Sequence, residues 1–302
     1  MRLLYRLTTR LAGRMTRRLL ISLAVLAATL GAATGIAVAQ PSTPTSTTTQ
    51  AIIAGGRIRS WVQITPLGAG TGSEPIIVVL SGVNATTDQE MARDGLLGLP
   101  AAGSAELIYP VPVSESWNAG GCCGAAAQQN VDDTGFLQAL VTKVDPGHSR
   151  PIFLAGYSNG GRLAYTIAAT DPALFDAYAV VKADPDPGIV VSKPFSILQI
   201  DSTNDYAVPY QPGDPGTEQP AATTEVARLR AVDGCPAPST TVSQGSVRVT
   251  TWGCQDQTRI TFAVYTGGGH GWPAGAAGTP SAASLIWGFF RDTAPVPASG
   301  SA

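Results

Sequence analysis

The pentapeptide Gly-Tyr-Ser-Asn-Gly at residues 156–160 is the part of this chain whose residue types and spacing most clearly suggest chemistry. A run at 150–155 that is apolar after its first residue precedes it, typical of a buried strand, and a run with the pattern of a helix follows at 159–169. Between a strand and a helix, Gly-x-Ser-x-Gly forms a strained turn that holds the serine hydroxyl clear of the backbone, at the positive end of the helix. Ser158 is therefore predicted to be a nucleophile. The alternative is a glycine-rich turn that carries an idle serine.

A serine hydroxyl needs an imidazole to accept its proton, and the chain contains only two histidines. His148 lies in a turn just ahead of the strand that leads to Ser158, so we expect it at the opposite end of the sheet. His270 lies in a glycine-rich loop at 266–273, after a strand-like run at 260–265. His270 is therefore the predicted base, by elimination.

The third member of such a site is a carboxylate that orients the imidazole, and it lies between serine and histidine in chain order. Asp205 is in the loop that follows a strand-like run at 195–200, and it is the predicted acid. Asp201 is closer to the strand and is predicted to be structural. Asp184 and Asp186 follow the preceding strand and remain the alternatives.

An acyl-transfer site also needs backbone N–H donors for the oxyanion that forms during the reaction. Asn159, directly after the nucleophile, is expected to supply one donor, and Val83, after the apolar run at 76–80, the other. Aromatic residues near the predicted site are candidates for the substrate pocket, although each is equally well explained as a core aromatic: Trp117, Tyr157, Tyr206 and Trp272.

These residues belong to an ordered series of short motifs, from the Gly-Gly-Arg at 55–57 to the Gly-Gly-His-Gly-Trp-Pro at 268–273. Between them lie Trp-Asn-Ala-Gly-Gly-Cys-Cys-Gly at 117–124, Val-Asp-Asp-Thr-Gly-Phe at 131–136, the pentapeptide itself, and the segment 205–210 with its Val-Pro-Tyr. The series resembles the polyhydroxybutyrate depolymerase and feruloyl esterase group of secreted α/β-hydrolases, the carbohydrate-esterase family 1 type, over about residues 55–287. The resemblance implies a triad acid at Asp205 and a base at His270. One departure is Ser81, where the family usually carries histidine.

Alternating strand and helix patterns predict a mostly parallel central sheet with helices on both faces, the α/β-hydrolase fold in a single domain. Asp132 and Asp133 are predicted to cap a helix rather than to act as a catalytic pair. Strands are expected at 57–65, 76–80, 106–109, 152–155, 177–181, 195–200 and 260–265, and helices at 133–144, 159–170, 223–232 and 282–291.

The first 39 residues have the pattern of a signal peptide: six arginines without an acidic residue, then an apolar run and Ala-Val-Ala before residue 40. An uncleaved membrane anchor is the alternative. Residues 40–52 are predicted to be a disordered Ser/Thr/Pro-rich tether, 53–292 the catalytic domain and 293–302 a flexible tail. The protein is therefore expected to be secreted.

Charge limits the partners. Removing the six leader arginines from the 19 basic residues leaves 13 against 21 acidic ones, a formal charge of −8. Such a surface argues against nucleic acid and against stable membrane association after cleavage. The expected partner is an ester substrate, small or polymeric, and the chemistry calls for no cofactor and no metal.

The four cysteines fit an oxidising compartment. Cys235 and Cys254 flank a polar segment and are predicted to form a disulfide. For the adjacent Cys122 and Cys123 the alternatives are a vicinal disulfide, a cysteine nucleophile or a structural loop that lines the pocket, and the last is favoured.

The predicted function is that of a secreted serine esterase acting on feruloyl or acetyl esters of plant polysaccharide, or on hydroxyalkanoate esters. Because no separate polymer-binding domain is visible, soluble esters or short chains are favoured. The alternatives are a serine peptidase on the same fold and a binding module that has lost its chemistry.

Overall fold

The computed structural model describes residues 43–68, 72–216 and 220–294, all of which fall in one compact unit, Ser42–Ala302. The predicted signal peptide at 1–39 lies outside the described residues, as does the predicted tail from residue 295 on. Within the described part of the chain, no helix is long and apolar enough to cross a bilayer.

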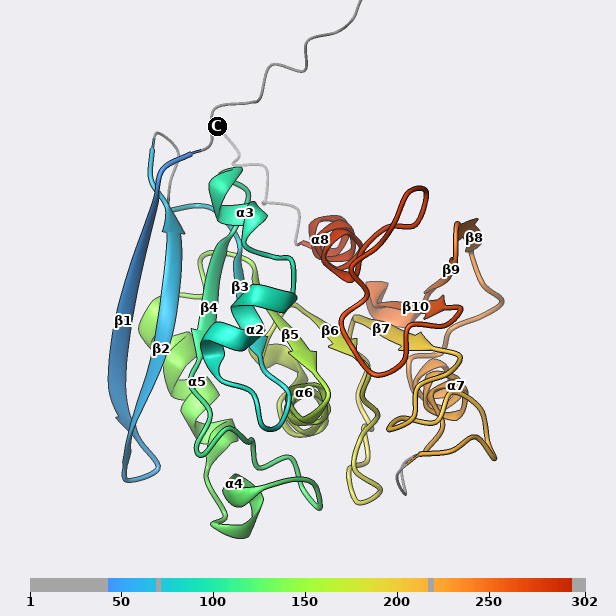
Figure 1. Ribbon diagram of the computed structural model, residues 1–302, viewed down its shortest axis with the longest axis horizontal. Coiled ribbons are helices and arrows are strands. Elements are labelled where there is room, and N and C mark those ends of the chain that lie inside the picture. The colour runs from blue at the N-terminus through green and yellow to red at the C-terminus, as the bar shows by residue number, and fades with distance from the viewer. Residues whose placement is uncertain (1–42, 69–71, 217–219, 295–302) are drawn as a thin grey trace, which may run out of the picture. The chain divides into compact units, whose positions relative to one another are not determined.

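The centre of the unit is a ten-stranded sheet with the order β1-β2-β4-β3-β5-β6-β7-β10-β9-β8 (Figure 1). The six strands from β4 to β10 in this order are parallel, whereas β2 joins β4 antiparallel at one end and β9 joins β10 antiparallel at the other. The strands are Thr45–Ala54 (β1), Arg57–Pro66 (β2), Ile76–Leu80 (β3), Glu106–Pro110 (β4), Ile152–Tyr157 (β5), Ala177–Val181 (β6), Ile197–Ser202 (β7), Thr240–Gln244 (β8), Val247–Gly253 (β9) and Arg259–Tyr265 (β10).

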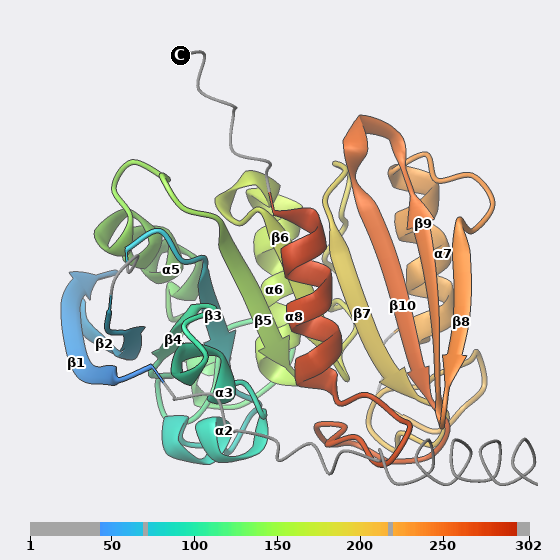
Figure 2. The same cartoon turned by 90° about the horizontal axis from the view of Figure 1, so that it is seen from above.

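Helices cover both faces of the sheet, which is why the central strands are continuous apolar runs rather than alternating ones. α5, α6 and α7 contribute to the core on one face, and α8 and residues around α2 to the core on the other (Figure 2). The helices are Thr87–Arg93 (α2), Gly98–Ala101 (α3), Ala125–Gln128 (α4), Asp133–Val144 (α5), Asn159–Thr170 (α6), Ala222–Val232 (α7) and Ala282–Thr293 (α8), with short 3₁₀ turns at Pro172–Leu174 and Gln255–Gln257.

The predicted mostly parallel sheet with helices on both faces is confirmed. All seven predicted strands and all four predicted helices are present, with ends that differ by at most two residues. The predicted cap is also correct, because the Asp132 carboxylate accepts the Gly135 N–H at the start of α5.

The predicted disordered tether is wrong from residue 45 onward. Residues Thr45–Ala54 form β1, which pairs along its whole length with β2. The two strands are joined by Gly55 and Gly56, whose φ angles of 56° and 72° suit a two-residue hairpin turn. The threonine-rich run looked like a linker because it lacks an apolar pattern, yet threonine is β-branched and favours strands.

The polar segment between the two later cysteines is also ordered. It forms the hairpin of β8 and β9, and β9 pairs with β10 at the edge of the parallel sheet. Every residue of β8 is exposed, so the hairpin lacks the buried face from which strands are usually predicted.

Candidate active site

Ser158 lies at the sharp turn between β5 and α6, with φ 52° and ψ −115°. Such a conformation is strained for a residue other than glycine and is held here by the Ser158 N–H, which donates to the Val181 carbonyl at 2.9 Å. A Cβ at Gly156 would lie 2.5 Å from the Gly160 carbonyl oxygen, and one at Gly160 would lie 2.6 Å from that of Leu80. Both motif glycines are therefore required by close backbone approach.

The structure brings Ser158, His270 and Asp205 into one hydrogen-bonded chain. His270 Nε2 lies 3.0 Å from Ser158 Oγ, and His270 Nδ1 lies 3.0 and 2.9 Å from the two carboxylate oxygens of Asp205. The three residues follow β5, β10 and β7, whose carboxyl ends meet at the same edge of the sheet, where α/β folds place their ligand sites.

Asp205 is held as an ionised acceptor. The N–H groups of Ala207 and Val208 donate to its Oδ1 at 2.8 and 3.0 Å. Burial alone would favour the neutral form, but the hydrogen bonds from His270, Val208 and Ala207 outweigh it and hold the pKa of Asp205 below its usual value.

The alternative acids have other contacts. Asp201 is buried within β7, where its Oδ2 accepts from Gln199 at 2.7 Å. Asp184 Oδ1 lies 3.4 Å from the same Gln199 amide nitrogen. Asp186 accepts the N–H of Gly121 at 2.7 Å and so tethers the loop that leads to the adjacent cysteines.

His148 lies at the other end of the sheet, as the topology predicts. Its Nε2 lies 3.3 Å from Asp176 Oδ2, and the same oxygen accepts the N–H of Ile152, the first residue of β5. Ser158 follows the opposite end of that strand, so His148 has no part in the site.

Three of the four predicted pocket aromatics surround His270. The Tyr157 hydroxyl donates to the His270 carbonyl at 3.1 Å, and its ring lies 5.7 Å from that of Trp272. Tyr206, 71% exposed, forms a T-shaped pair with the imidazole, with ring centroids 5.7 Å apart. This arrangement leaves an exposed aromatic ring beside the hydrogen-bonded chain.

The prediction that Trp117 lines the pocket is wrong. It is fully buried in the core, and its indole N–H donates to the Ser81 carbonyl at 3.0 Å. Its backbone N–H and carbonyl are both bonded to the side chain of Asn159, at 2.7 and 3.1 Å. Trp117 therefore links the loop that carries Val83 to Asn159 at the start of α6 and does not line a cavity.

Glu90 and Arg93 on α2 are site residues that sequence reasoning missed. Glu90 is buried, and its carboxylate accepts the Trp272 indole N–H at 2.7 Å and the Gly82 N–H at 3.4 Å. Arg93 pairs with Glu90 and lies over the Tyr157 ring at 4.8 Å. Burial raises the pKa of Glu90, although the charge of Arg93 opposes this.

A sequence signal for this helix does exist. Thr86 and Gln89 form a capping box at the start of α2, with both reciprocal hydrogen bonds present. A helix that begins there places Glu90 and Arg93, three residues apart, on the same face.

Both cysteine pairs are bonded. Cys235 and Cys254 form the predicted disulfide, with Cα atoms 4.1 Å apart. Cys122 and Cys123 form a vicinal disulfide, one of the alternatives to the favoured structural loop, whose redox state the sequence leaves open. The Cys122 carbonyl lies 3.4 Å from Asn159 Nδ2, which places the pair beside the residue that follows the nucleophile.

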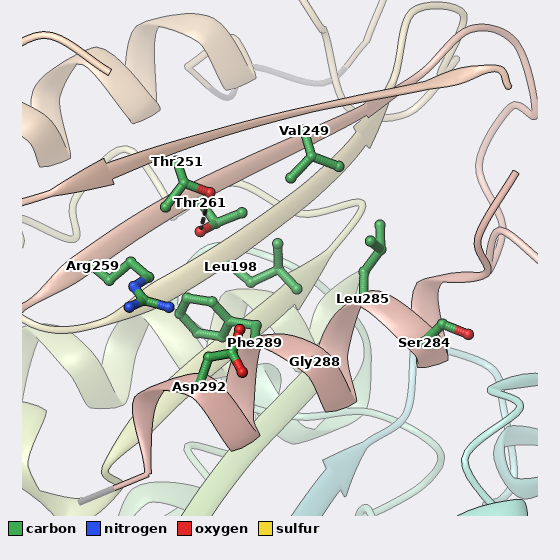
Figure 3. Close-up of a pocket in the computed structure, with 10 residues that line it drawn as sticks. All are labelled: Leu198, Val249, Thr251, Arg259, Thr261, Ser284, Leu285, Gly288, Phe289 and Asp292. Atoms are coloured by element: carbon green, nitrogen blue, oxygen red, sulfur yellow. Dashed lines mark hydrogen bonds between the residues drawn. The ribbon is translucent and has the colours of Figure 1, made fainter. Parts of the chain in front are cut away.

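The described residues contain no cluster of three or more side chains suited to a metal ion. One cavity of about 200 Å³ lies between α8 and the face formed by β7, β9 and β10 (Figure 3). It is lined by residues such as Leu198, Thr251, Arg259 and Phe289 and by none of the three hydrogen-bonded residues, so it is separate from the candidate active site.

No family model matches the chain. It is 27% identical over 198 residues to esterase NocK of Nocardia uniformis subsp. tsuyamanensis, and 29% identical over 205 residues to feruloyl esterase C of Emericella nidulans. Each alignment covers 63% of this chain. The first spans 56% of the length of its relative and the second 66%.

Among solved structures, the acetyl xylan esterase of Aspergillus awamori superposes with a TM-score of 0.52 at 16% identity, covering 74% of this chain and 94% of that one. At this identity the likeness concerns the fold alone. The predicted α/β-hydrolase fold and the resemblance to the feruloyl esterase group are both confirmed.

Proposed function

We propose that the protein is a serine esterase that hydrolyses carboxylic esters through an acyl-enzyme, with Ser158 as nucleophile, His270 as base and Asp205 as acid. The observation that carries the proposal is the continuous hydrogen-bonded path from the Ser158 hydroxyl through both imidazole nitrogens to the Asp205 carboxylate. Relatives named as esterases support it.

The mechanism follows from this path. His270 Nε2 takes the proton of Ser158 as Oγ attacks the ester carbonyl, and it then returns the proton to the departing alcohol. Asp205 accepts the hydrogen bond from Nδ1–H, which fixes the tautomer and stabilises the imidazolium. Water then enters and gives a proton to His270 as its oxygen attacks the acyl carbonyl. His270 returns this proton to Ser158 Oγ, which releases the carboxylic acid product and restores Ser158.

The oxyanion of each tetrahedral intermediate is assigned to the backbone N–H groups of Asn159 and Val83. Asn159 is the first residue of α6, so its N–H also belongs to the positive end of the helix. Backbone donors do not depend on side-chain identity, which is why Ser81 in place of the family's usual histidine is compatible with the proposal.

The proposed substrates are feruloyl or acetyl esters of plant polysaccharide, or short hydroxyalkanoate esters. The names of the similar proteins, feruloyl esterase C and acetyl xylan esterase, support the first two. The aromatic wall of Tyr157, Trp272 and the exposed Tyr206 suits the flat face of a phenolic or sugar ring.

Secretion is proposed from the leader pattern at residues 1–39 and agrees with the Cys235–Cys254 disulfide, which persists in oxidising compartments. The catalytic domain is proposed to include the β1–β2 hairpin and thus to begin near residue 43.

Ser158→Ala tests the proposal. With p-nitrophenyl acetate as substrate, the purified variant should lose several orders of magnitude in kcat while its melting temperature stays near that of the wild type. Wild-type turnover in Ser158→Ala would end the serine-esterase assignment. An inactive wild type would favour the binding module, and cleavage of a p-nitroanilide would favour the peptidase. Methyl ferulate, acetylated xylan and hydroxybutyrate oligomers then identify the preferred ester.

A further inference from the structure

A buried lysine lies directly beneath the candidate active site, and the proposed mechanism does not use it. Lys182 follows the last residue of β6, and its side chain is completely shielded from solvent. Its φ of 54° is in the left-handed region, which costs energy for a residue other than glycine. Buried charge and backbone strain at one residue, next to a site, point to a function.

The backbone of Lys182 lies between the strand that carries the nucleophile and the strand that carries the acid. The preceding carbonyl, that of Val181, accepts the N–H of Ser158 at 2.9 Å. The Lys182 N–H donates to the Ile200 carbonyl in β7, also at 2.9 Å. A single strained residue therefore connects the turn at Ser158 with the strand that leads to Asp205.

The side chain continues this connection. Lys182 Nζ donates to the hydroxyl of Ser202, the last residue of β7. The acid turn starts at this residue, because the Ser202 carbonyl lies 3.5 Å from the Asp205 nitrogen. The next N–H, that of Thr203, donates to the carbonyl of Tyr265 at the end of β10. The Thr203 hydroxyl accepts the N–H of Gly267 at 3.2 Å, which joins the acid turn to the histidine loop.

The ammonium group also has charged neighbours. Burial lowers the pKa of Lys182 to about 8, while the carboxylates of Asp201 and Asp205 act in the opposite direction. Asp201 is buried as well; its Oδ1 has no hydrogen-bond partner within the described residues, and burial raises its pKa to about 7. The other charged groups that face this cluster are Asp184, Glu225 of α7 and Arg162 of α6.

We infer that Lys182 is a positioning residue for the proposed reaction: through the Ser202 hydroxyl, its ammonium group fixes the turn that holds Asp205 against His270. This inference rests on the proposed esterase function. Among the hydrogen bonds of the described residues, the one from Lys182 is the only one that a charged side chain makes to Ser202, the residue at which the acid turn starts.

Two variants separate position from charge. Lys182→Met keeps the length of the side chain but removes both the charge and the donor. We expect kcat to fall by about tenfold with KM unchanged, since the acid turn loosens while the pocket aromatics stay in place. Because the positive charge that acts on the carboxylate of Asp205 is lost, the acidic limb of the kcat/KM profile should also move upward by about half a pH unit. The shift stays small because Asp201, whose pKa is raised by burial, takes up a proton when the ammonium group is lost, so that one negative charge disappears with the positive one.

Ser202→Ala removes the link but keeps the ammonium group. It should lower kcat by a similar factor and leave the acidic limb where it is. The matched control is Arg162→Met, which removes a buried cation whose charge acts on Asp186 and Asp184. It should lower the melting temperature without moving the acidic limb.

Wild type and Ser158→Ala are measured alongside on p-nitrophenyl acetate. If these two do not differ, the esterase proposal fails. If the wild type is active and both Lys182→Met and Ser202→Ala keep its kcat and pH profile, only the positioning role fails. Should Lys182→Met not fold, Ser202→Ala decides: reduced kcat at unchanged KM supports the role, and wild-type kcat overturns it.

Discussion

Replacing Cys235 and Cys254 together by serine should lower the stability of the protein without altering its chemistry. The disulfide joins residues 19 apart and thereby ties the segment after α7 to the residue that follows β9. In the chain-entropy model, a loop of this size restricts the unfolded chain by about 3 kcal/mol. For a domain of about this length, each kcal/mol corresponds to roughly 2–4 °C in melting temperature, so the expected loss is roughly 6–12 °C.

The measurement is a thermal melt of wild type and variant, with and without reductant, next to p-nitrophenyl acetate turnover at 25 °C. The disulfide lies at the amino end of β10, whereas His270 follows its carboxyl end, so turnover at 25 °C should be unchanged. In the double variant, reductant acts only on Cys122 and Cys123, which isolates their contribution. A melting temperature within about 2 °C of wild type would refute this reasoning, and so would a double variant that loses turnover at 25 °C along with its thermal stability.

Two further pairs of substitutions test the site. His270→Ala should reduce kcat as severely as Ser158→Ala, and the double variant should be hardly worse than either, because the two residues act as a unit. The control, His148→Ala, should keep wild-type turnover. An essential His148 would contradict the topology. Asp205→Asn should lower kcat by about 10⁴-fold because it leaves the imidazole in the wrong tautomer. Asp186→Asn, which removes only the hydrogen bond to the Gly121 loop, should lower kcat by less than about tenfold. The reverse ranking would reassign the acid.

The central elements and the three interacting residues were predictable because their signals are local. β3, β5 and β6 are fully buried, so each is a continuous apolar run in the sequence. The serine motif lies between such a strand and a helix, and the chain offers only two histidines. Parallel strands then place the loops that follow them at one edge of the sheet, so strand order alone implies that these residues meet.

The remaining features depend on contacts between residues far apart in the chain. β1 and β8 are exposed edge strands, and what orders them is pairing with β2 and β9 rather than an apolar pattern of their own. Trp117 belongs to a motif near the site, but whether an aromatic ring lines a pocket or fills a core depends on which loop packs over it. Here the side chain of Asn159 closes over its backbone and the core encloses its ring.

The loop at Ser81–Val83 shows how a site tolerates the loss of a motif residue. The Ser81 hydroxyl is buried without a hydrogen-bond partner within the described residues, so this side chain does little to hold the loop. The backbone is fixed from outside instead: Trp117 donates to the Ser81 carbonyl, and Glu90 accepts the Gly82 N–H while it also binds Trp272, two residues beyond His270. The proposed oxyanion donor at Val83 is thus tied to the histidine loop through one buried carboxylate. Since an oxyanion hole depends on where its N–H groups point, this bracing from α2 explains how the loop keeps its place without the histidine usual in the group that the chain resembles.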